Sequence, residues 1–398
     1  MFDITIIGAG IVGLATAHRL LEIKPGLRIA VFEKEKTVAF HQSSRNSGVI
    51  HSGIYYQPGS QKALNCRKGY DALLHFCKAH GIQHDICGKV IVATKKEEQG
   101  LLDNIYQRGL ANGLKGIRKI GPDELKEKEP YAQGIEAIWV PQAGIISYKS
   151  VAEKYLERIN LAGAAVFLGE KVQKVVPGNS AVTVCTSHRE IQTRQLIACS
   201  GLYADHVAKL TGEQLNLKIL PFRGEYYELK KEKEYLVNNL IYPVPNPAFP
   251  FLGVHFTRMI EGGIESGPNA VLAFRREGYH LKDFEFKEFF EMIGFKGLRK
   301  LAAKYWRLEL DEFHRSFSKR AFLKSLQKLI PAIGYDDIEI GRSGVRAQAV
   351  GNDGSLVDDF FIVEKGPVIN VLNAPSPAAT ASLAIGERIA NTALRKHT

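Results

Sequence analysis

Apolar and polar residues follow two rhythms along the chain, and these predict where strands and helices lie. Phe2 to Ile7 is a short apolar run, and a helical pattern follows from about Ile11 to Glu22. A second apolar run, Leu27 to Phe32, ends at Glu33. This order predicts a strand, a helix and a second strand, which together form a βαβ unit.

The pattern changes character near Pro221. Before it, short apolar strands alternate with helical stretches, whereas the strands after it become longer and more alternating. Small residues return from Ile340, and a closing helix is expected over 377–394. We therefore expect an α/β fold in which a nucleotide-binding domain is interrupted by a mixed-sheet (α+β) substrate domain. The nucleotide-binding domain is predicted over 1–88, 145–218 and 338–398, and the substrate domain over 89–144 and 219–337.

Length and composition describe a folded protein of about two domains. The chain has 398 residues, 45% of them hydrophobic, and a net charge of +11. A basic balance suits an anionic small substrate, an anionic membrane surface or nucleic acid, but no known nucleic-acid-binding motif appears. No run of 18 apolar residues is present, so no transmembrane span is expected. The five cysteines form no CxxC pair, which predicts a cytoplasmic protein without disulfides or a metal site.

The turn after the first strand reads GAGIVG and supplies Gly8, Gly10 and Gly13. The first glycine allows a tight turn, the second lets the backbone approach a pyrophosphate, and the third permits close helix–strand packing. Glu33 follows 20 residues after Gly13, where a carboxylate can accept hydrogen bonds from a ribose diol. A glycine-rich turn alone is common, but here the strand, the helix and the acidic residue agree. The sequence therefore predicts a dinucleotide site.

FAD fits this pattern better than NAD. The nucleotide block is interrupted, and strand ends rich in small residues recur in ACSG near position 200 and in NVLNAPSPAATASLAIG at the C-terminus. Such a pattern suits FAD held along its whole length. Ser376 is expected to cap a helix that opens at Pro377, whose free N–H groups would stabilise a reduced flavin. An ordinary capped helix in the core is the alternative.

The stretch SSRNSG, Ser43 to Gly48, follows the second strand. Its hydroxyls and backbone N–H groups can bind phosphate and ribityl oxygens, although a surface turn would have the same composition. The predicted FAD contacts are Gly8, Gly10, Ile11, Val12, Gly13, Glu33, Lys34, Ser43, Ser44, Asn46, Ser47, Gly48, Val49, Val172, Ser200, Gly201, Pro375, Ser376, Pro377, Ala378, Ala379 and Thr380.

Longer blocks from both ends and the middle of the chain form a recognisable set. They include MFDITIIGAGIVGLATA, RNSGVIHSGIYY, GVHFTRMIEGGIESGPNAVLAF, GRSGVRAQ and NAPSPAATASLAIG. Over nearly the whole chain, this set resembles L-2-hydroxyglutarate oxidases and dehydrogenases, FAD enzymes of the D-amino-acid oxidase/glycine oxidase superfamily. The resemblance implies a GR2-type Rossmann FAD-binding domain and a mixed-sheet domain covering the flavin. It also implies oxidation of L-2-hydroxyglutarate to 2-oxoglutarate by hydride transfer to flavin N5, with reoxidation by oxygen or a quinone-type acceptor.

That reaction needs a base for the hydroxyl proton and cations for two carboxylates. The resemblance places His51 beside the flavin ring, and we predict that it is the catalytic base or a flavin-side proton handler. Arg346 is expected to bind the C1 carboxylate and Arg258 the distal one, because arginine binds carboxylates in bidentate fashion. Arg275 is another candidate for the distal carboxylate, but a surface or sheet-edge charge is the better interpretation of it. The remaining substrate-binding candidates are His255, Tyr56 and Tyr242, although core packing is an alternative role for the tyrosines.

Two other functions stay open on the sequence. One is an amine or amino-acid oxidase of the same superfamily, and the other is a flavin-binding subunit without turnover. The segment 280–330 has apolar residues at helical spacing with Lys and Arg opposite, which predicts packing onto the substrate domain. The alternative for this segment is peripheral contact with the inner face of the cytoplasmic membrane, where electrons could pass to quinone.

Overall fold

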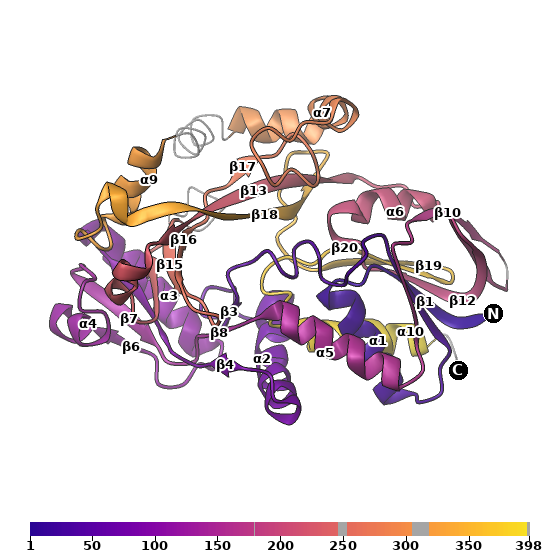
Figure 1. The fold of residues 1–398 in the computed structure, drawn as a ribbon, viewed down its shortest axis with the longest axis horizontal. Coiled ribbons are helices and arrows are strands. Elements are labelled where there is room, and N and C mark those ends of the chain that lie inside the picture. The colour runs from indigo at the N-terminus through magenta and orange to yellow at the C-terminus, as the bar shows by residue number, and fades with distance from the viewer. Residues whose placement is uncertain (179, 246–252, 305–317, 396–398) are drawn as a thin grey trace.

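Three sheets organise the chain in a computed structural model that describes residues 1–178, 180–245, 253–304 and 318–395 (Figure 1). Within these ranges, an eight-stranded sheet lies at one end of the molecule and a nine-stranded sheet at the other. A three-stranded sheet lies between them and consists of β3 (Val49–Ile50), β4 (His84–Asp85) and β8 (Gly144–Ile146).

The eight-stranded sheet has β1 near its centre. β1 pairs in parallel with β12 on one side and β2 on the other, so that Ile7 lies opposite both Ala198 and Phe32. Because parallel strands end at the same edge, the loops that begin at Gly8 and Lys34 meet there. The strands are β1 (Phe2–Ile7), β2 (Ile29–Glu33), β9 (Ala165–Leu168), β10 (Val172–Pro177), β11 (Val182–Thr186), β12 (Glu190–Ala198), β19 (Phe361–Lys365) and β20 (Val368–Asn373).

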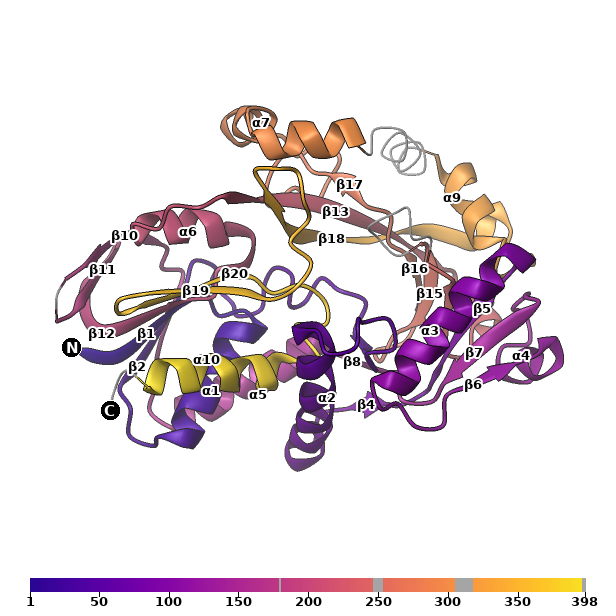
Figure 2. The same ribbon diagram turned by 180° about the vertical axis from the view of Figure 1, so that it is seen from behind.

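Helices cover both faces of this sheet (Figures 1 and 2). On one face, Ile4 and Ile6 of β1 pack with Leu14 and Leu20 of α1 in a fully buried core. Burial of such side chains contributes about 1.5–3 kcal/mol each to folding. The helices of that face are α1 (Ile11–Ile23), α2 (Gln61–His80), α5 (Tyr148–Leu161) and α10 (Ser382–Leu394), whereas α6 (Ala204–Leu210) contacts β10 and β20 from the other.

The nine-stranded sheet is built around two long antiparallel strands, β13 and β18, which pair along most of their length. At its other side β5 pairs in parallel with β14. The strands are β5 (Lys89–Ala93), β6 (Arg118–Ile120), β7 (Glu136–Val140), β13 (Leu217–Leu229), β14 (Leu240–Pro243), β15 (His255–Arg258), β16 (Ile264–Gly267), β17 (Val271–Leu272) and β18 (Ile338–Gly351).

Short helices surround the nine-stranded sheet (Figure 2). They include α3 (Gln99–Ala111), α4 (Pro122–Lys128), α7 (Phe286–Ile293), a helical stretch over 296–304 and α9 (Lys319–Leu326). The 3₁₀ turns among the described residues are η1 (Lys96–Glu98), η2 (Gly201–Tyr203), η3 (Lys231–Leu236) and η4 (Tyr335–Asp337). None of the described helices is both long and apolar enough to cross a lipid bilayer.

The predicted division into a nucleotide-binding domain and a substrate domain stays an interpretation, in which each large sheet belongs to one domain. Strands from within 89–140 and 217–351 form the nine-stranded sheet, so the chain passes between the sheets more than once. β18 begins at Ile338 and pairs with β13, whereas β19 and β20 belong to the first sheet. The predicted segment 338–398 therefore contributes strands to both large sheets.

The prediction that the closing helix opens at Pro377 is wrong. Residues 377–381 form turns, α10 starts at Ser382, and its N-cap residue is Ala381 rather than Ser376. The buried side chain of Thr380 explains the difference, because its Oγ1 accepts a hydrogen bond from the backbone N–H of His51. This contact to a distant loop holds the segment as a turn, and the free N–H groups expected of a first helical turn begin later in the chain.

The prediction that the 280–330 segment packs onto the substrate domain is correct for only some of its residues. Met292 of α7 and Phe322 of α9 are buried, as the apolar spacing predicted. Phe286 and Phe290 are instead 72% and 66% exposed. Residues 305–317 of this segment lie outside the described part of the chain.

Candidate active site

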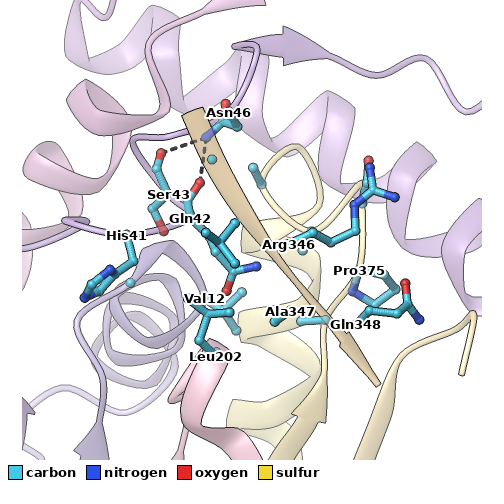
Figure 3. A pocket seen from close by; sticks show the side chains of 18 of the residues that line it. Val12, His41, Gln42, Ser43, Asn46, Leu202, Arg346, Ala347, Gln348 and Pro375 are labelled. Carbon is cyan, nitrogen blue, oxygen red and sulfur yellow. Dashed lines mark hydrogen bonds between the residues drawn. The ribbon is translucent and has the colours of Figure 1, made fainter. Parts of the chain in front are cut away.

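A cavity of about 950 Å³ is lined by residues of both large sheets. This volume lies near the upper end of the range of roughly 300–1,000 Å³ that is typical of small-molecule sites. Figure 3 shows part of its wall, with Arg346, Gln348 and Pro375 on one side and, on the other, His41, Gln42, Ser43 and Asn46. The cavity can therefore hold an extended ligand between the two sheets.

The glycine loop after β1 forms one end of the cavity. Gly8 has a φ of 104°, and a Cβ at this position would lie 2.4 Å from the carbonyl oxygen of Cys199. A Cβ on Gly13 would lie 2.0 Å from the carbonyl oxygen of Gly8. Neither position can hold a larger residue without a backbone shift, so the motif is required both for the turn and for the close approach of α1.

Two side chains complete the wall at the glycine loop. Glu33 accepts hydrogen bonds from the backbone N–H groups of Ala9 (2.8 Å) and Glu35 (3.0 Å). Its carboxylate oxygens keep further lone pairs and line the cavity. Ser43 Oγ accepts a hydrogen bond from the N–H of Ile11, 2.9 Å away, at the N-terminus of α1. A phosphate oxygen is the ligand that such a helix N-terminus favours.

The residues present fit the predicted FAD. The glycine cradle leaves room for a pyrophosphate, and the buried hydroxyl of Ser200 has no hydrogen-bond partner among the described residues. Most of the predicted contacts line the cavity, namely Gly8, Gly10, Ile11, Val12, Glu33, Lys34, Ser43, Asn46, Ser47, Val49, Val172, Ser200, Gly201, Pro375, Ser376, Pro377, Ala378 and Ala379.

Four of the predicted cofactor contacts do not line the cavity: Gly13, Ser44, Gly48 and Thr380. Gly13 and Gly48 lie where backbones approach closely, and a Cβ on Gly48 would lie 2.5 Å from the carbonyl oxygen of Ile146. The hydroxyl of Ser44 donates to the carbonyl of Phe40, 3.2 Å away.

His51 directly follows β3 and lines the cavity. Its Nε2 atom lies 3.3 Å from Oγ of Ser376, and its carbonyl oxygen accepts a hydrogen bond from Sγ of Cys66. Burial, together with the nearby Lys89 and His255, lowers the pKa of His51 to about 3. The imidazole is therefore neutral near neutral pH, with one ring nitrogen that is a hydrogen-bond acceptor.

His255 opens β15 and provides a second imidazole in the cavity. Its Nδ1 lies 2.9 Å from the carbonyl oxygen of Gly253. Because a carbonyl can only accept, we assign the proton to Nδ1, which leaves Nε2 with a free lone pair. Burial lowers the pKa of His255 to about 4, and the ring stacks on Tyr242 with centroids 3.9 Å apart.

Arg346 projects from β18 into the cavity (Figure 3). Its side chain is accessible within the cavity yet surrounded by protein, and this burial lowers its pKa. A guanidinium still remains charged under all ordinary conditions. Tyr226 and Asp358 also line the cavity and act on Arg346 electrostatically. The arrangement suits a bidentate contact with a carboxylate.

Arg258 does not line the cavity, unlike the other predicted substrate-binding residues. It lies at the end of β15, and its guanidinium pairs with the carboxylate of Asp85. Tyr56 and Tyr242, in contrast, both line the cavity. The structure thus brings His51, His255 and Arg346 together but leaves the second predicted arginine elsewhere.

Sequence reasoning missed three residues around this part of the cavity. Tyr55 and Tyr226 line it, and Lys89 lies behind it with 1% exposure. Tyr55 directly precedes Tyr56 in a block that was already singled out. A lysine at the start of the apolar run KVIVA is also a recognisable signal, because a lysine is rarely buried in a strand unless its charge is paired.

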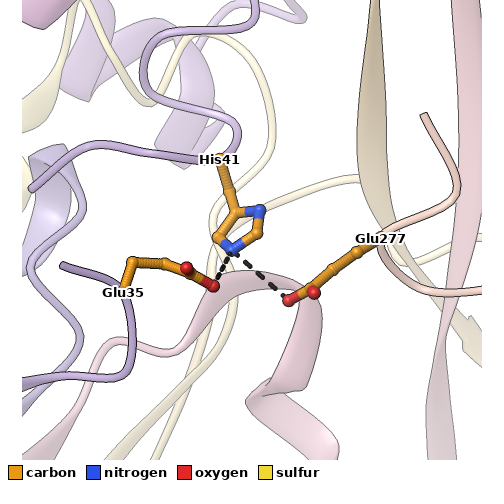
Figure 4. A group of neighbouring side chains, drawn as sticks. All are labelled: Glu35, His41 and Glu277. Atoms are coloured by element: carbon orange, nitrogen blue, oxygen red, sulfur yellow. Dashed lines mark hydrogen bonds and ion pairs between the residues drawn. The ribbon is translucent and has the colours of Figure 1, made fainter. Parts of the chain in front are cut away.

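Glu35, His41 and Glu277 form a group with metal-ligating side chains near the same cavity (Figure 4). The Lys34 ammonium contacts both carboxylates and lies 3.0 Å from Nε2 of His41. The Lys34 ammonium therefore already supplies the positive charge that these two carboxylates would otherwise need from a metal ion. The group forms an ion-pair network that joins the segment after β2 to the loop after β17.

Comparisons with known proteins agree with the geometry. The family described as FAD dependent oxidoreductase (DAO) matches residues 3–392. The chain is 54% identical to L-2-hydroxyglutarate dehydrogenase of Indibacter alkaliphilus, with 99% of each chain covered. It is 43% identical to L-2-hydroxyglutarate dehydrogenase of Escherichia coli strain K12 (98% of this chain, 92% of the other). It is 45% identical to the mitochondrial L-2-hydroxyglutarate dehydrogenase of Homo sapiens (98% and 88%).

Solved structures share the fold at lower identity. FAD-bound L-alpha-glycerophosphate oxidase from Mycoplasma pneumoniae superposes with a TM-score of 0.80 at 20% identity, covering 99% of this chain and 94% of that chain. Glycine oxidase from Geobacillus kaustophilus gives 0.74 at 18% identity, covering 100% and 95%. The family match over almost the whole chain, the glycine cradle and the shared fold lead to one conclusion: the chain belongs to the DAO family of FAD-dependent oxidoreductases.

Proposed function

We propose that the protein oxidises L-2-hydroxyglutarate to 2-oxoglutarate with FAD as the electron acceptor. The observation that carries the proposal is the meeting of two neutral imidazoles, His51 and His255, with the guanidinium of Arg346 in one cavity. Relatives that are named L-2-hydroxyglutarate dehydrogenase, at 54% and 43% identity over nearly the full chain, support this choice of substrate.

Oxidation of a secondary alcohol breaks the O–H bond and the C2–H bond of the substrate. FAD, when bound, supplies the acceptor for the hydride from C2. His51 takes the hydroxyl proton in this proposal, because it lines the cavity and its ring is neutral near neutral pH; the burial that keeps it neutral also makes it a weaker base than a free histidine. Arg346 binds the C1 carboxylate and so fixes which face of C2 is turned toward the cofactor.

His255 positions the substrate in this proposal. Its Nδ1 is held by the carbonyl of Gly253, so its Nε2 can only accept a hydrogen bond while the ring is neutral. The substrate hydroxyl has a single proton, which goes to His51 in this proposal, so His255 positions the substrate only as part of the cavity wall and is the second candidate for the base. Tyr56 and Tyr242 line the same cavity, and their hydroxyls can donate hydrogen bonds to carboxylate oxygens.

Anaerobic mixing of the FAD-loaded protein with L-2-hydroxyglutarate tests the function. We expect the flavin absorbance to bleach and 2-oxoglutarate to form in equal amount. The D-enantiomer should leave the flavin oxidised, because C2 would present its hydrogen to the wrong face. Bleaching by glycine or sarcosine, but not by L-2-hydroxyglutarate, would instead identify an amine oxidase. No bleaching by any 2-hydroxy acid would favour a subunit without turnover.

We also propose that the electrons leave to oxygen or to a quinone-type carrier, and that an exposed apolar surface supports the second route. We name this the α7 surface, formed by Leu281, Phe284, Phe286, Phe290 and Ile293. Three of these residues recur at positions i, i+4 and i+7 of α7 and form one outward row. Lys282 and Lys287 lie beside it in the sequence together with four acidic residues, whereas four basic residues follow α7: Lys296, Arg299, Lys300 and Lys304. The charge that suits an anionic lipid surface therefore lies mainly beyond the helix, next to its apolar row.

Sedimentation with vesicles tests this contact. The FAD-loaded protein should sediment with vesicles rich in anionic phospholipid and less with neutral ones. A Phe286→Ser/Phe290→Ser double variant should lose this binding, whereas Leu161→Ser, which removes an exposed leucine on α5, should not. Equal binding of the double variant would exclude the α7 surface. Reoxidation rates with oxygen and with a quinone analogue then identify the acceptor.

A further inference from the structure

Lys89 is a buried lysine behind one wall of the cavity. It opens β5, and its side chain is 1% exposed. Its Nζ atom lies 4.6 Å from the ring centroid of Tyr55 and 4.6 Å from that of Tyr242. Both tyrosines line the cavity, whereas Lys89 does not. The amine is thus separated from the cavity by two aromatic rings, whose faces favour a cation.

Lys89 lacks a carboxylate partner within the described part of the chain. No ion pair or hydrogen bond joins its amine to an Asp or Glu there, and the Cys66 thiol is the group that favours its charge. Burial raises the pKa of Cys66 to about 12, so this thiol stays protonated. Asp358 lines the cavity and acts on Arg346, but it is not among the groups that shift the pKa of Lys89.

The other titratable groups around Lys89 are also neutral or positive. His51 and His255 are uncharged near neutral pH, and the charge of Lys89 is one reason for their low pKa values. Burial raises the pKa of Tyr55 and of Tyr242, so both hydroxyls stay protonated. Lys89 and its neighbours are therefore basic groups on which no carboxylate of the described residues acts, and a ligand that brings negative charge would lower the cost of burying the Lys89 ammonium.

We propose that Lys89 determines specificity for a substrate with two carboxylates: it supplies the second positive charge from behind Tyr55 and Tyr242, and its amine takes up a proton from solvent as that substrate binds. This inference rests on the proposed function, which requires one cation for each carboxylate. Arg346 provides the first. Arg258, the second cation that the sequence suggested, is paired with Asp85 outside the cavity.

Binding and protonation are linked at this position. Burial lowers the pKa of Lys89 to about 7, so the amine is divided between its neutral and charged forms near neutral pH. A carboxylate in the cavity favours the ammonium form, and the proton that completes it comes from solvent and remains on Nζ. By reciprocity, protonation of Lys89 strengthens binding of the dianion. Tyr55 can contact the substrate directly, because its buried hydroxyl has no hydrogen-bond partner among the described residues and can donate to a carboxylate.

If Lys89 served only the fold, its replacement would lower stability and affect all substrates alike. Replacing a buried charge without a carboxylate partner by an apolar side chain of similar shape is instead often neutral or stabilising. Lys89→Met should therefore fold, load FAD and unfold at the same or a higher temperature. Its loss should be confined to ligands that carry a second carboxylate.

The test compares wild type, Lys89→Met and a control, Lys78→Met, which changes an exposed lysine on α2. Each FAD-loaded protein is reduced anaerobically by L-2-hydroxyglutarate and by (S)-2-hydroxyvalerate, which has a methyl group in place of the distal carboxylate. We expect Lys89→Met to weaken apparent affinity for the dicarboxylate at least about tenfold and to leave that for the monocarboxylate unchanged within about twofold. The control should resemble wild type with both.

Proton uptake gives a second measurement that does not depend on turnover. Binding of 2-oxoglutarate to the oxidised, FAD-loaded wild type in weakly buffered solution with a pH indicator should remove protons at pH 7.5, and Lys89→Met should not show this signal. Absence of uptake in wild type overturns the proposal even if the variant fails to fold. If L-2-hydroxyglutarate reduces wild type but Lys89→Met keeps the same substrate preference, the Lys89 role fails and the proposed function stands. If L-2-hydroxyglutarate does not reduce wild type, the proposed function itself fails.

Discussion

The backbone N–H of His51 donates a hydrogen bond to Oγ1 of Thr380, and the two atoms lie 3.1 Å apart. The same oxygen lies 2.6 Å from the hydroxyl of Tyr148, which in turn donates to the carbonyl of Val49. One threonine thus connects the loop after β3, the helix α5 and the turn before α10. Because Thr380 is buried, this hydrogen bond fixes the backbone of His51, whose ring lines the cavity.

Thr380→Val tests that relationship. The substitution keeps the shape of the side chain but leaves the N–H of His51 without its acceptor, which should cost about 1–3 kcal/mol of the free energy of unfolding. We expect kcat to fall more than KM rises, because His51 loses its fixed position while Arg346 is untouched. Urea unfolding and steady-state kinetics measure the two effects. Thr380→Ser keeps the hydroxyl and should stay close to wild type in both.

Removal of either imidazole separates the proposed base from the positioning residue. His51→Ala should still bind FAD but should lower the rate of flavin reduction by roughly 10²–10⁴-fold, the usual contribution of a general base. His255→Ala should chiefly raise KM. Stopped-flow reduction under anaerobic conditions measures both, with exposed His188→Ala as the control. Fast reduction in His51→Ala together with slow reduction in His255→Ala would transfer the base role to His255.

The two arginines in the prediction should now behave differently. Arg346→Gln removes a cation that faces the cavity. We expect kcat/KM for L-2-hydroxyglutarate to fall by an amount that corresponds to a loss of about 2–5 kcal/mol of transition-state stabilisation. Arg258→Gln breaks a pair with Asp85 away from the cavity and should change kcat/KM much less. An unchanged KM in Arg346→Gln would remove Arg346 from the anchor role.

Stability should fall with pH below the ordinary pKa of histidine. The folded protein holds His51 and His255 neutral down to about pH 3 and 4, whereas the unfolded chain takes up a proton at each near pH 6.5. Between these values the unfolded state binds more protons, so the free energy of unfolding decreases as pH falls, by up to about 1.4 kcal/mol per pH unit for each histidine.

The His51→Gln/His255→Gln double variant should show a flatter pH dependence than wild type in urea unfolding from pH 7 to pH 5. Buried Glu129, whose pKa burial raises to about 7, shifts stability in the opposite direction over this range. That contribution is common to both proteins, so the difference between their slopes isolates the histidines. Parallel slopes would show that the two imidazoles titrate normally in the folded state.

The local pattern was enough to predict the nucleotide end of the molecule. A strand, a glycine turn and a helix are close in sequence, so apolar spacing and the special conformation of Gly8 specify them without long-range information. The predicted strand and helix at Phe2 and Ile11 begin where β1 and α1 begin. The start of α10 was missed because it depends on the contact between Thr380 and His51, which lie 329 positions apart.

The substrate end depended on tertiary contacts in the same way. Arg258 and Arg346 look equally suitable in sequence, and only the pairing of Arg258 with Asp85, 173 positions away, distinguishes them. Lys89 was missed because its role depends on two tyrosines from distant segments that enclose its amine. The outward row of α7 has the same helical spacing as a buried stripe, so periodicity alone could not tell which face it occupies.

The glycine cradle gives a final test that separates cofactor binding from catalysis. In Gly8→Ala the new methyl group would lie 2.4 Å from the carbonyl oxygen of Cys199, on a backbone with a φ of 104°, and we expect loss of bound FAD. Gly26→Ala is the matched control, because Gly26 also has a positive φ (87°) but no atom within 4 Å of the added Cβ. Backbone strain alone should cost each variant about 1–3 kcal/mol. FAD content measured after gel filtration should therefore fall in Gly8→Ala and stay near wild type in Gly26→Ala, since only Gly8 lies where the α1 N-terminus, Cys199 and the cavity meet.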